Sequence, residues 1–330
     1  MFGPAADPVL LTARAAAEAG AWGEVRAHLE PQAAASERDG ARASLLAEAC
    51  LRTGDPRTAT RWLETAAPLL VLTGDRPGLR RVVNMQGAAA FALGTLEGAA
   101  ERFGAALEMA RADGDALLTA RAINNLGAID ALRGDTDRAI AAYQLAIPVY
   151  HRMGQTLGLA ESWHNLAISY RSQDQLHDAD EAERRAIEYA GEAGSPGLAA
   201  MAQVGRAEVA LRRGDFVFAH ASASRAAGVF STLPDFLLQA DAIRVQAAAS
   251  DRLHREADAD AELARAYSLA RTHAHRLQES QILQTHAEIL LRRGAIAGAR
   301  SRAHEALAGF EALGSTAAAR EMRLFLARLA

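Results

Sequence analysis

The sequence contains no lysine, only one cysteine, and few aromatic residues or prolines. Aromatic residues make up 5% of the 330 residues, and there are nine prolines. The single cysteine, Cys50, excludes an internal disulfide. Since β-branched and aromatic residues are scarce, the chain cannot furnish a sheet of ordinary size. No stretch approaches the roughly 18 uncharged apolar residues that a membrane-spanning helix requires.

The sequence also has no large excess of charge of either sign. The formal net charge is −4 and no segment is strongly basic, so the chain lacks the positive field that grips phosphate backbones or anionic lipid. We therefore expect no nucleic acid and no membrane among its partners. The N-terminus has no basic leader before an apolar run, which predicts a cytoplasmic protein. Arginine in place of every lysine, with abundant alanine, suggests a GC-rich bacterial genome.

Motifs of catalysis are absent as well. The sequence has no phosphate-binding glycine loop after a strand, no Gly-x-Ser-x-Gly elbow and no compact metal-ligand spacing among its ten histidines. We therefore expect a protein that is not an enzyme and that holds no cofactor and no metal.

Alanine is the residue that the chain has in excess, with 80 copies. Together with leucine, arginine and glutamate it favours helix. The chain is 50% hydrophobic, which is too apolar for a disordered segment. The composition predicts an all-α fold.

A repeat of 40 residues organises these helices. Turn positions recur every 40 residues at Gly54, Gly94, Gly134, Asp174, Gly214, His254 and Gly294, and Gly20 lies 34 residues before the first of them. A second series of breakers lies about twenty residues later, at Gly74, Gly114, Gly154, Gly194, Pro234, Ala274 and Gly314. Two breakers in each repeat predict a pair of antiparallel helices. Asp55, Asp135 and Asp215 follow a turn glycine and are predicted to cap the next helix.

Small residues occupy fixed columns of the repeat. Alanine stands five residues after seven of the eight turns, and twelve residues after the same seven. The position seven residues before each turn is alanine or glycine throughout. Helices that cross at about 8 to 10 Å need small contact residues, so these columns are predicted to lie at helix crossings. Cys50 occupies a similar helix position and is predicted to be core, whereas Pro68 and Pro148 are expected to bend or end their helices.

Stacked hairpins of this kind form a solenoid, because one repeat cannot bury its apolar stripe alone. We expect a single right-handed α-α superhelix of about eight antiparallel hairpins over residues 1–330. The predicted repeats are 5–39, 40–78, 79–118, 119–157, 158–197, 198–237, 238–277 and 278–314. Residues 315–330 are predicted to form a capping helix, with a homodimer contact as the alternative role of that helix.

These residues resemble the tetratricopeptide repeat family. The family pattern is seen in three consecutive repeats, as Gly87, Gly94, Ala99, Phe103 and Ala106, then Asn124, Asn125, Leu126, Gly127, Gly134, Ala139, Tyr143 and Ala146, then Trp163, Leu166, Ala167, Tyr170, Ala179 and Ala186. The closing proline is missing and the period is 40 rather than 34. Ala223, Leu263 and Ala303 replace the usual aromatic residue in the last three repeats. The longer period is similar to kinesin light chains and to the sensor arms of bacterial transcription regulators.

A column of polar residues is the candidate binding site. Asn84, Asn124 and His164 share one repeat position, and Asn125 and Asn165 share the next. An asparagine amide can both donate to and accept from a peptide backbone. The resemblance implies that such asparagines bind extended peptides in the concave groove. The alternative interpretation is that they bond to neighbouring helices or face water.

Arginines accompany this column. Arg81 and Arg121 precede Asn84 and Asn124 by three residues, hence on the same helical face, and Arg244 occupies the asparagine column two repeats after His164. Guanidinium groups of this kind could hold ligand carboxylates. Glu208, Asp241, Asp251 and Glu288 suggest a groove that becomes more acidic toward the C-terminal end.

Two functions fit these features. The first is a scaffold that binds a peptide or protein segment in its groove without chemistry. The second is a regulatory sensor, in which a signalling peptide or small molecule changes the superhelix and thereby acts in trans on a transcription or signalling partner. The partner in either case is a protein or peptide.

Overall fold

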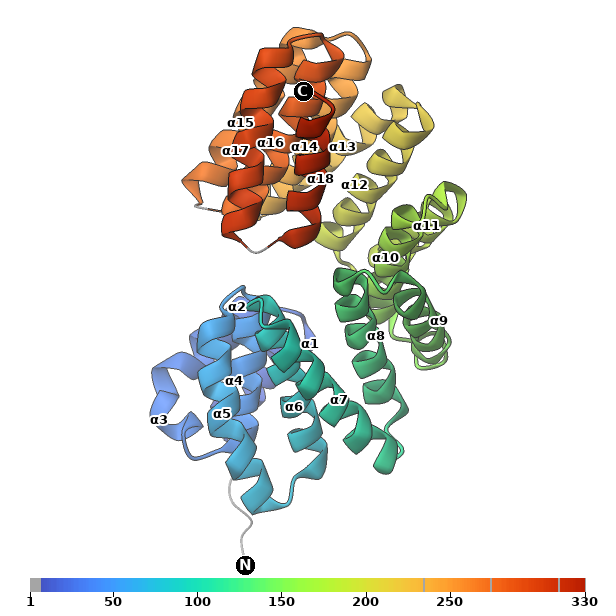
Figure 1. Cartoon of the computed structure of the whole chain (residues 1–330). Coiled ribbons are helices and arrows are strands. Elements are labelled where there is room, and N and C mark those ends of the chain that lie inside the picture. Colours follow the sequence, from blue (N-terminus) through green and yellow to red (C-terminus); the bar gives the residue numbers. More distant parts are fainter. Residues whose placement is uncertain (1–6, 234, 274, 314, 330) are drawn as a thin grey trace, which may run out of the picture. The chain divides into compact units, whose positions relative to one another are not determined.

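The computed structural model describes residues 7–233, 235–273, 275–313 and 315–329. Helices are the regular elements throughout these ranges, with no strand among them, which confirms the predicted all-α fold (Figure 1). The chain divides into two compact units, residues 1–154 (unit 1) and 155–330 (unit 2). The prediction of one continuous array over both units stays a prediction. No described helix is both long enough and apolar enough to cross a membrane.

Unit 1 consists of consecutive antiparallel hairpins, in which the two helices of each pair pack side by side. Its pairs are α1 (Pro8–Glu18) with α2 (Trp22–Leu29), α4 (Gly40–Arg52) with α5 (Pro56–Thr73), α6 (Arg76–Ala92) with α7 (Leu96–Ala112), and α8 (Ala116–Arg133) with α9 (Thr136–Arg152). A 3-10 turn, η1 (Glu30–Gln32), and the short α3 (Ala33–Ser36) join the first pair to the second.

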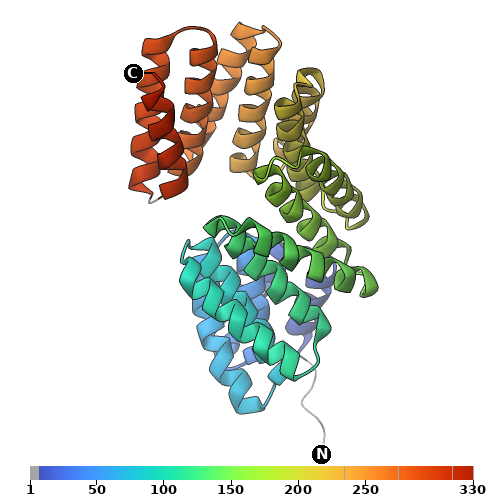
Figure 2. The ribbon, with the colours of Figure 1, turned by 45° about the vertical axis from the view of Figure 1, so that its right-hand side comes forward.

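Unit 2 repeats the arrangement (Figure 2). Its pairs are α10 (Thr156–Ser172) with α11 (Leu176–Glu192), α12 (Pro196–Arg213) with α13 (Phe216–Phe230), α14 (Phe236–Arg252) with α15 (Glu256–Thr272), and α16 (Arg276–Arg292) with α17 (Ile296–Ala312), followed by α18 (Thr316–Ala327). Helix α18 packs on α17 through buried Ala319 and Met322. Its outward positions carry exposed Arg320, Glu321 and Arg323. A homodimer through this helix stays a prediction.

The turns confirm the predicted 40-residue register. All six glycines of the first turn series adopt a positive φ, and so do Gly74, Gly114, Gly154 and Gly194 of the second. Asp174 and His254 also adopt the left-handed conformation, with φ of 62° and 60°, because the repeat places them where glycine stands elsewhere. Pro234, Ala274 and Gly314 lie outside the described residues.

Two of the three predicted aspartate caps are confirmed. Asp55 accepts a hydrogen bond from the Thr58 amide, and Asp215 accepts one from the Phe218 amide, both at 3.1 Å. The prediction was wrong for Asp135, whose side chain caps no amide of its helix. Its carboxylate instead lies 4.0 Å from the Arg138 guanidinium one helical turn later.

The alanine columns lie at helix crossings, as predicted. Every alanine five or twelve residues after a turn has no exposed surface. Where glycine stands seven residues before a turn, an aromatic ring from the paired helix fills the space. A Cβ at Gly87 would lie 2.5 Å from the Phe103 ring, and one at Gly127 would lie 3.0 Å from the Tyr143 ring. Small residues therefore set how closely each pair can pack.

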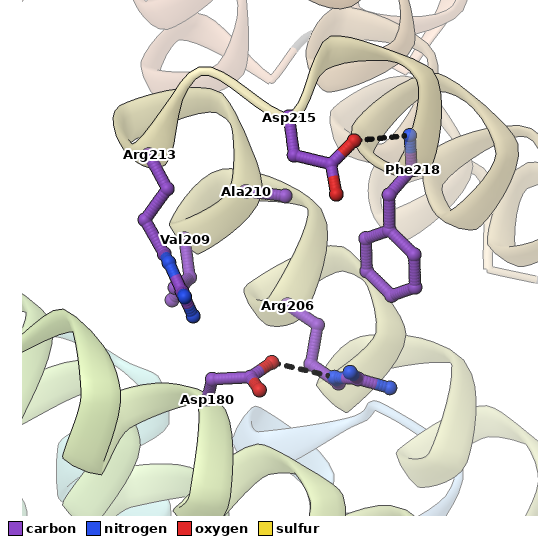
Figure 3. Close-up of a pocket in the computed structure, with 7 residues that line it drawn as sticks. All are labelled: Asp180, Arg206, Val209, Ala210, Arg213, Asp215 and Phe218. Carbon is purple, nitrogen blue, oxygen red and sulfur yellow. Dashed lines mark hydrogen bonds and ion pairs between the residues drawn. The ribbon is translucent and has the colours of Figure 1, made fainter.

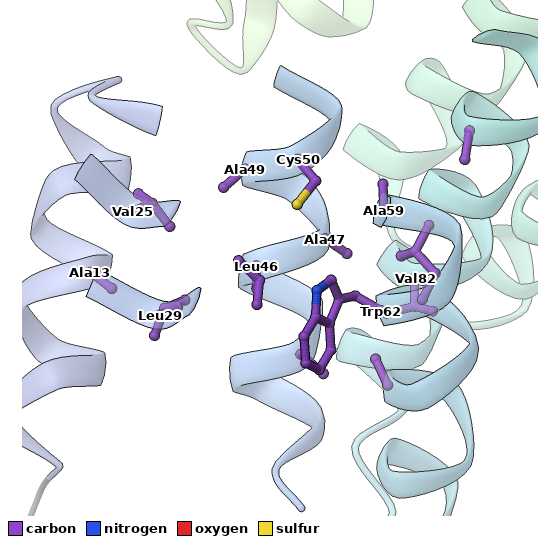
Figure 4. Packing of buried hydrophobic residues seen from close by; sticks show 14 of the residues in the cluster. Ala13, Val25, Leu29, Leu46, Ala47, Ala49, Cys50, Ala59, Trp62 and Val82 are labelled. Carbon is purple, nitrogen blue, oxygen red and sulfur yellow. The ribbon is translucent and has the colours of Figure 1, made fainter. Parts of the chain in front are cut away.

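The core of unit 1 runs between its helix layers (Figure 4). Cys50 lies within it and is fully buried, which confirms its predicted place in the core. Burial raises the pKa of its thiol. Pro68 and Pro148 were expected to bend or end their helices, and they do not end them, because α5 and α9 continue to Thr73 and Arg152. A bend at these prolines stays a prediction. Leu70 and Tyr150, both 3% exposed, pack in the turn after each proline, and their burial offsets the missing backbone hydrogen bond.

Candidate functional site

The first helices of successive hairpins form one surface in each unit. In unit 1, α4 contacts α6 and α6 contacts α8; in unit 2, α10, α12, α14 and α16 contact one another in series. Successive second helices are not comparably close among the described residues. The first helices therefore line the inner side of each stack, and equal repeat positions on them become neighbours.

In unit 1 this proximity joins two of the predicted asparagines. The Asn125 Nδ2 on α8 donates to the Asn84 Oδ1 on α6 at 3.4 Å. The two bonded asparagines do not hold equal repeat positions, because Asn124 is the residue equivalent to Asn84 and Asn125 follows it. Both partners are half-buried, so their remaining amide groups still reach the surface. Asn124 is only 6% exposed and turns toward the protein interior.

Two predicted arginines lie on the same helices, and both are exposed. Arg81 on α6 and Arg121 on α8 form no ion pair with any described residue. Arg80, directly before Arg81, is buried instead and pairs with Asp113 and with Asp115 Oδ2, the latter at 3.1 Å. Hydrogen bonds from Arg80 lower the pKa of Asp113. The fold thus uses Arg80 for packing and leaves Arg81 and Arg121 available to a ligand.

In unit 2, His164 belongs to a buried pair. Its Nδ1 lies 2.9 Å from Oε2 of Glu183 on α11, and Glu183 has no exposed surface. Glu183 occupies the repeat position that Phe103 and Tyr143 hold in the two preceding hairpins. Burial raises the pKa of Glu183, while His164 acts in the opposite direction. The Glu183 Oε1 has no hydrogen-bond partner among the described residues. It lies against Gly205, and a Cβ added to that glycine would be 1.9 Å from it.

Arg244 is held in an ion-pair network. Its Nη2 lies 2.8 Å from Glu208 Oε1, and its Nε lies 2.9 Å from Asp241 Oδ1. Arg171 binds the other oxygen of Glu208 at 2.7 Å. Burial opposes ionisation of Glu208, but these two guanidinium groups outweigh it and lower its pKa. Arg244, which was predicted to contact an anion of a ligand, is therefore already paired with two carboxylates of the protein, Glu208 and Asp241.

The acidic residues expected in this region have partners of their own. Arg292 and Arg293 hold Asp251 at 3.0 and 2.8 Å, and Gln284 donates to Glu288 at 3.3 Å. Because half-buried Glu208 and buried Asp251 each face two guanidinium groups, the surface is less acidic than the sequence suggested.

The network borders a pocket of about 130 Å³ in unit 2. Its polar wall comprises His164, Arg171, Glu208 and Asp241, and its apolar wall includes Ile168, which is 38% exposed. The remaining lining residues are Met201, Val204, Gly205, Phe230 and Leu238.

The predicted site residues thus fall into separate groups. Unit 1 holds Arg81, Asn84, Arg121, Asn124 and Asn125. Unit 2 holds His164, Asn165 and Arg244. His164 and Arg244 meet in one network, whereas Asn165 is half-buried and forms no hydrogen bond with any residue that the structure describes. Sequence reasoning missed Glu183, Arg171 and Glu208 as parts of that network. A carboxylate at an aromatic position of the repeat was the signal that could have found Glu183.

Comparisons with known proteins agree with the repeat. The family described as "Tetratricopeptide repeat" matches residues 81–152 and 118–192. No curated protein sequence matches the chain. A Rap protein complexed with the competence and sporulation factor superimposes with a TM-score of 0.67 at 12% identity, over 97% of this chain and 96% of that one.

Two further structures of similar length share the fold. The apo form of the quorum sensor NprR from B. thuringiensis has a TM-score of 0.62 at 12% identity, over 97% of both chains. Aspartyl phosphate phosphatase F from Bacillus subtilis has a TM-score of 0.54 at 13% identity, over 100% of this chain and 96% of that one. With the paired helices and the 40-residue columns, these matches show a helical-repeat fold of the tetratricopeptide type, and residues 81–192 of it match the family itself.

Proposed function

We propose that the chain is a non-enzymatic bacterial scaffold of the cytoplasm that binds an extended peptide or protein segment on the first-helix surface of unit 1. The observation that carries this proposal is the hydrogen bond between Asn84 and Asn125, with Arg81 and Arg121 exposed and unpaired on the same two helices. The Asn84 amide nitrogen and the Asn125 carbonyl are left to pair with a peptide backbone. The arginines add charge-assisted contacts to carboxylates.

The asparagines cannot supply the affinity alone. A net hydrogen bond contributes about 0.5 to 1.5 kcal/mol, and one to a charged group about 1.5 to 3 kcal/mol. A micromolar complex requires about 8 kcal/mol. Two arginine contacts and the two asparagines together reach about 4 to 9 kcal/mol, so through most of this range the bound segment must also cover apolar surface. Half-buried Met85 follows Asn84 on α6 and is a candidate for that apolar contact.

A displayed library of random peptides tests the proposal. Peptides selected on the wild-type chain are measured by fluorescence polarisation against two double variants, Asn84→Ala/Asn125→Ala and Arg81→Ala/Arg121→Ala. We expect each variant to weaken binding at least tenfold.

The matched control replaces two exposed, unpaired arginines of the second helices, Arg111→Ala/Arg152→Ala, and should change affinity less than twofold. Equal affinity for the wild type and both first-helix variants would show that this surface is not the site. Failure to select any peptide would count against a peptide-binding scaffold.

A regulatory sensor that acts in trans is the second candidate. The pocket of unit 2, with the buried Glu183 beside it, favours this function, because an occupant that altered the His164–Glu183 pair would change the packing of α10, α11 and α12. Likeness over nearly the full length to the quorum sensor NprR is consistent with it. A sensor should change its small-angle scattering profile when the selected peptide binds, whereas a rigid scaffold should keep it.

A further inference from the structure

A second pocket in unit 2 lies apart from both groups of predicted site residues. It encloses about 270 Å³ between α11, α12 and α13 (Figure 3). The residues that line it are Asp180, Arg206, Val209, Ala210, Arg213, Asp215 and Phe218. Figure 3 shows the Arg213 side chain extending along one wall of the pocket, with Phe218 on the opposite side.

Two charged groups of this pocket, Asp180 and Arg206, form an ion pair, and a third, Asp215, accepts a hydrogen bond from the Phe218 amide. Asp180 accepts from the Arg206 Nε at 2.8 Å, and its other oxygen lies 3.3 Å from the Arg184 Nε. The Arg206 guanidinium also lies over the Phe218 ring, 4.8 Å from its centroid. Arg213 is exposed and forms no hydrogen bond or ion pair with any described residue.

The repeat shows what Arg213 lacks. Arg293 occupies the same position two repeats later, and its guanidinium lies 2.8 Å from Asp260 Oδ1 and 2.8 Å from Asp251 Oδ1. The residue equivalent to Asp260 is Asp180, which Arg206 and Arg184 already hold. The residue equivalent to Asp251 is Arg171, a cation. Neither position therefore offers Arg213 a carboxylate, and the pocket is open beside it.

We propose that this pocket binds the carboxylate of an external ligand, which pairs with Arg213 as Asp251 and Asp260 pair with Arg293. Guanidinium and carboxylate groups match in a bidentate geometry. Half-buried Phe218 offers apolar surface to the carbon atoms next to the carboxylate. Asp180 and Asp215 lie on the same walls and repel a doubly charged phosphate more than a single carboxylate.

The pocket has room for a carboxylate and the carbon atoms next to it. Such a carboxylate comes either from an acidic side chain of a docked protein or from a free small acid. This site is independent of the first-helix surface of unit 1, so each can fail without the other.

The test follows the side-chain Nε–Hε resonance of Arg213 by NMR at constant ionic strength. The resonance is assigned by its loss in Arg213→Ala. The carboxylate probes are glutarate and the α-amide of N-acetyl-glutamate, whose side-chain carboxylate is free. The comparison probes are the α-amide of N-acetyl-glutamine, which is isosteric but uncharged, and inorganic phosphate. We expect both carboxylates to shift the resonance. Affinities for the variants are measured from the backbone amide resonance of Phe218, which every variant keeps, and should be at least tenfold weaker for Arg213→Ala than for the wild type. Arg225→Ala, which removes another exposed and unpaired arginine on α13, should bind within twofold of the wild type.

The relative affinities of the two carboxylates identify the source of the ligand. Tighter binding of the N-acetyl-glutamate amide supports an acidic side chain of a protein, and tighter binding of glutarate supports a free acid. The proposal is overturned if no probe shifts the resonance, if the glutamine compound binds as well as its acid, or if phosphate binds more tightly than both carboxylates. Equal loss in Arg213→Ala and Arg225→Ala overturns it as well.

Discussion

Removal of the His164 imidazole should destabilise unit 2 strongly at neutral pH. His164→Ala leaves Glu183 fully buried without its hydrogen-bond partner. Breaking a buried pair by removing one partner costs about 3 to 5 kcal/mol. Arg171 partly compensates the charge of Glu183 and Glu208 opposes it, but neither forms a direct contact with the Glu183 carboxylate. We therefore expect a loss of about 3 kcal/mol or more in the free energy of unfolding at pH 7.

The loss should depend on pH. The pKa of Glu183 lies above its ordinary value of 4.5 in the folded protein, so the folded state keeps this proton to higher pH than the unfolded chain. The contribution of Glu183 is therefore complete below pH 4.5 and is lost as pH rises through the folded pKa. Without His164, which lowers this pKa, the decline should extend to higher pH. Near pH 4.5 Glu183 keeps its proton, so His164→Ala no longer leaves a buried charge and its cost should fall to that of one hydrogen bond, about 1 kcal/mol.

Urea unfolding monitored by far-UV circular dichroism at pH 4.5 and pH 7 measures both values, and hydrogen exchange of α10, α11 and α12 assigns the loss to this region. Glu183→Gln removes the charge and keeps the shape, so His164→Ala in that background should cost only about 1 kcal/mol at pH 7. His177→Ala, an exposed histidine on α11, is the matched control. A cost below 1 kcal/mol for His164→Ala at pH 7, or equal costs at both pH values, would refute the reasoning.

Three further substitutions test the repeat geometry by thermal and urea unfolding. Gly87→Ala places a Cβ 2.5 Å from the Phe103 ring and should cost about 1 to 3 kcal/mol, whereas Gly104→Ala, with open space around it, should be neutral or stabilising; equal effects would contradict the close packing. Ala139→Leu overpacks a fully buried crossing and should cost a similar 1 to 3 kcal/mol, and an unchanged melting temperature would contradict the register. His254→Gly relieves a left-handed φ of 60° at an exposed turn and should stabilise the protein by about 0.5 to 1 kcal/mol, so a destabilised variant would show that the turn is not strained.

The fold could be predicted because its constraints recur. Every helix crossing needs a small residue and every turn needs a left-handed one, so the same demand appears at seven turns spaced 40 residues apart. Even Asp174 and His254, which depart from glycine, kept their predicted turns because the neighbouring repeats fix the register. Asp135 and the two prolines show the limit of such rules, since a nearby arginine or later buried side chains can override a local preference.

The candidate site was less predictable because it depends on how helices are rotated against each other. The diagonal bond between Asn84 and Asn125 follows from the stagger of α6 and α8, which a column of equal positions does not define. Arg80 and Arg81 are adjacent in sequence, yet only the helix orientation decides that one is buried and the other exposed. The His164–Glu183 contact joins two positions of the repeat that hold different residues elsewhere.

The fixed register also restricts how the length of this chain can change. A deletion of residues 214–253 joins Arg213 to His254, and a left-handed residue again follows the helix while the alanine columns stay aligned. A deletion in this region whose length is not a multiple of 40 residues rotates the later helices and moves polar side chains into the crossings. Length is therefore tolerated in steps of 40 residues, and variants of this protein that gain or lose material should do so by whole hairpins.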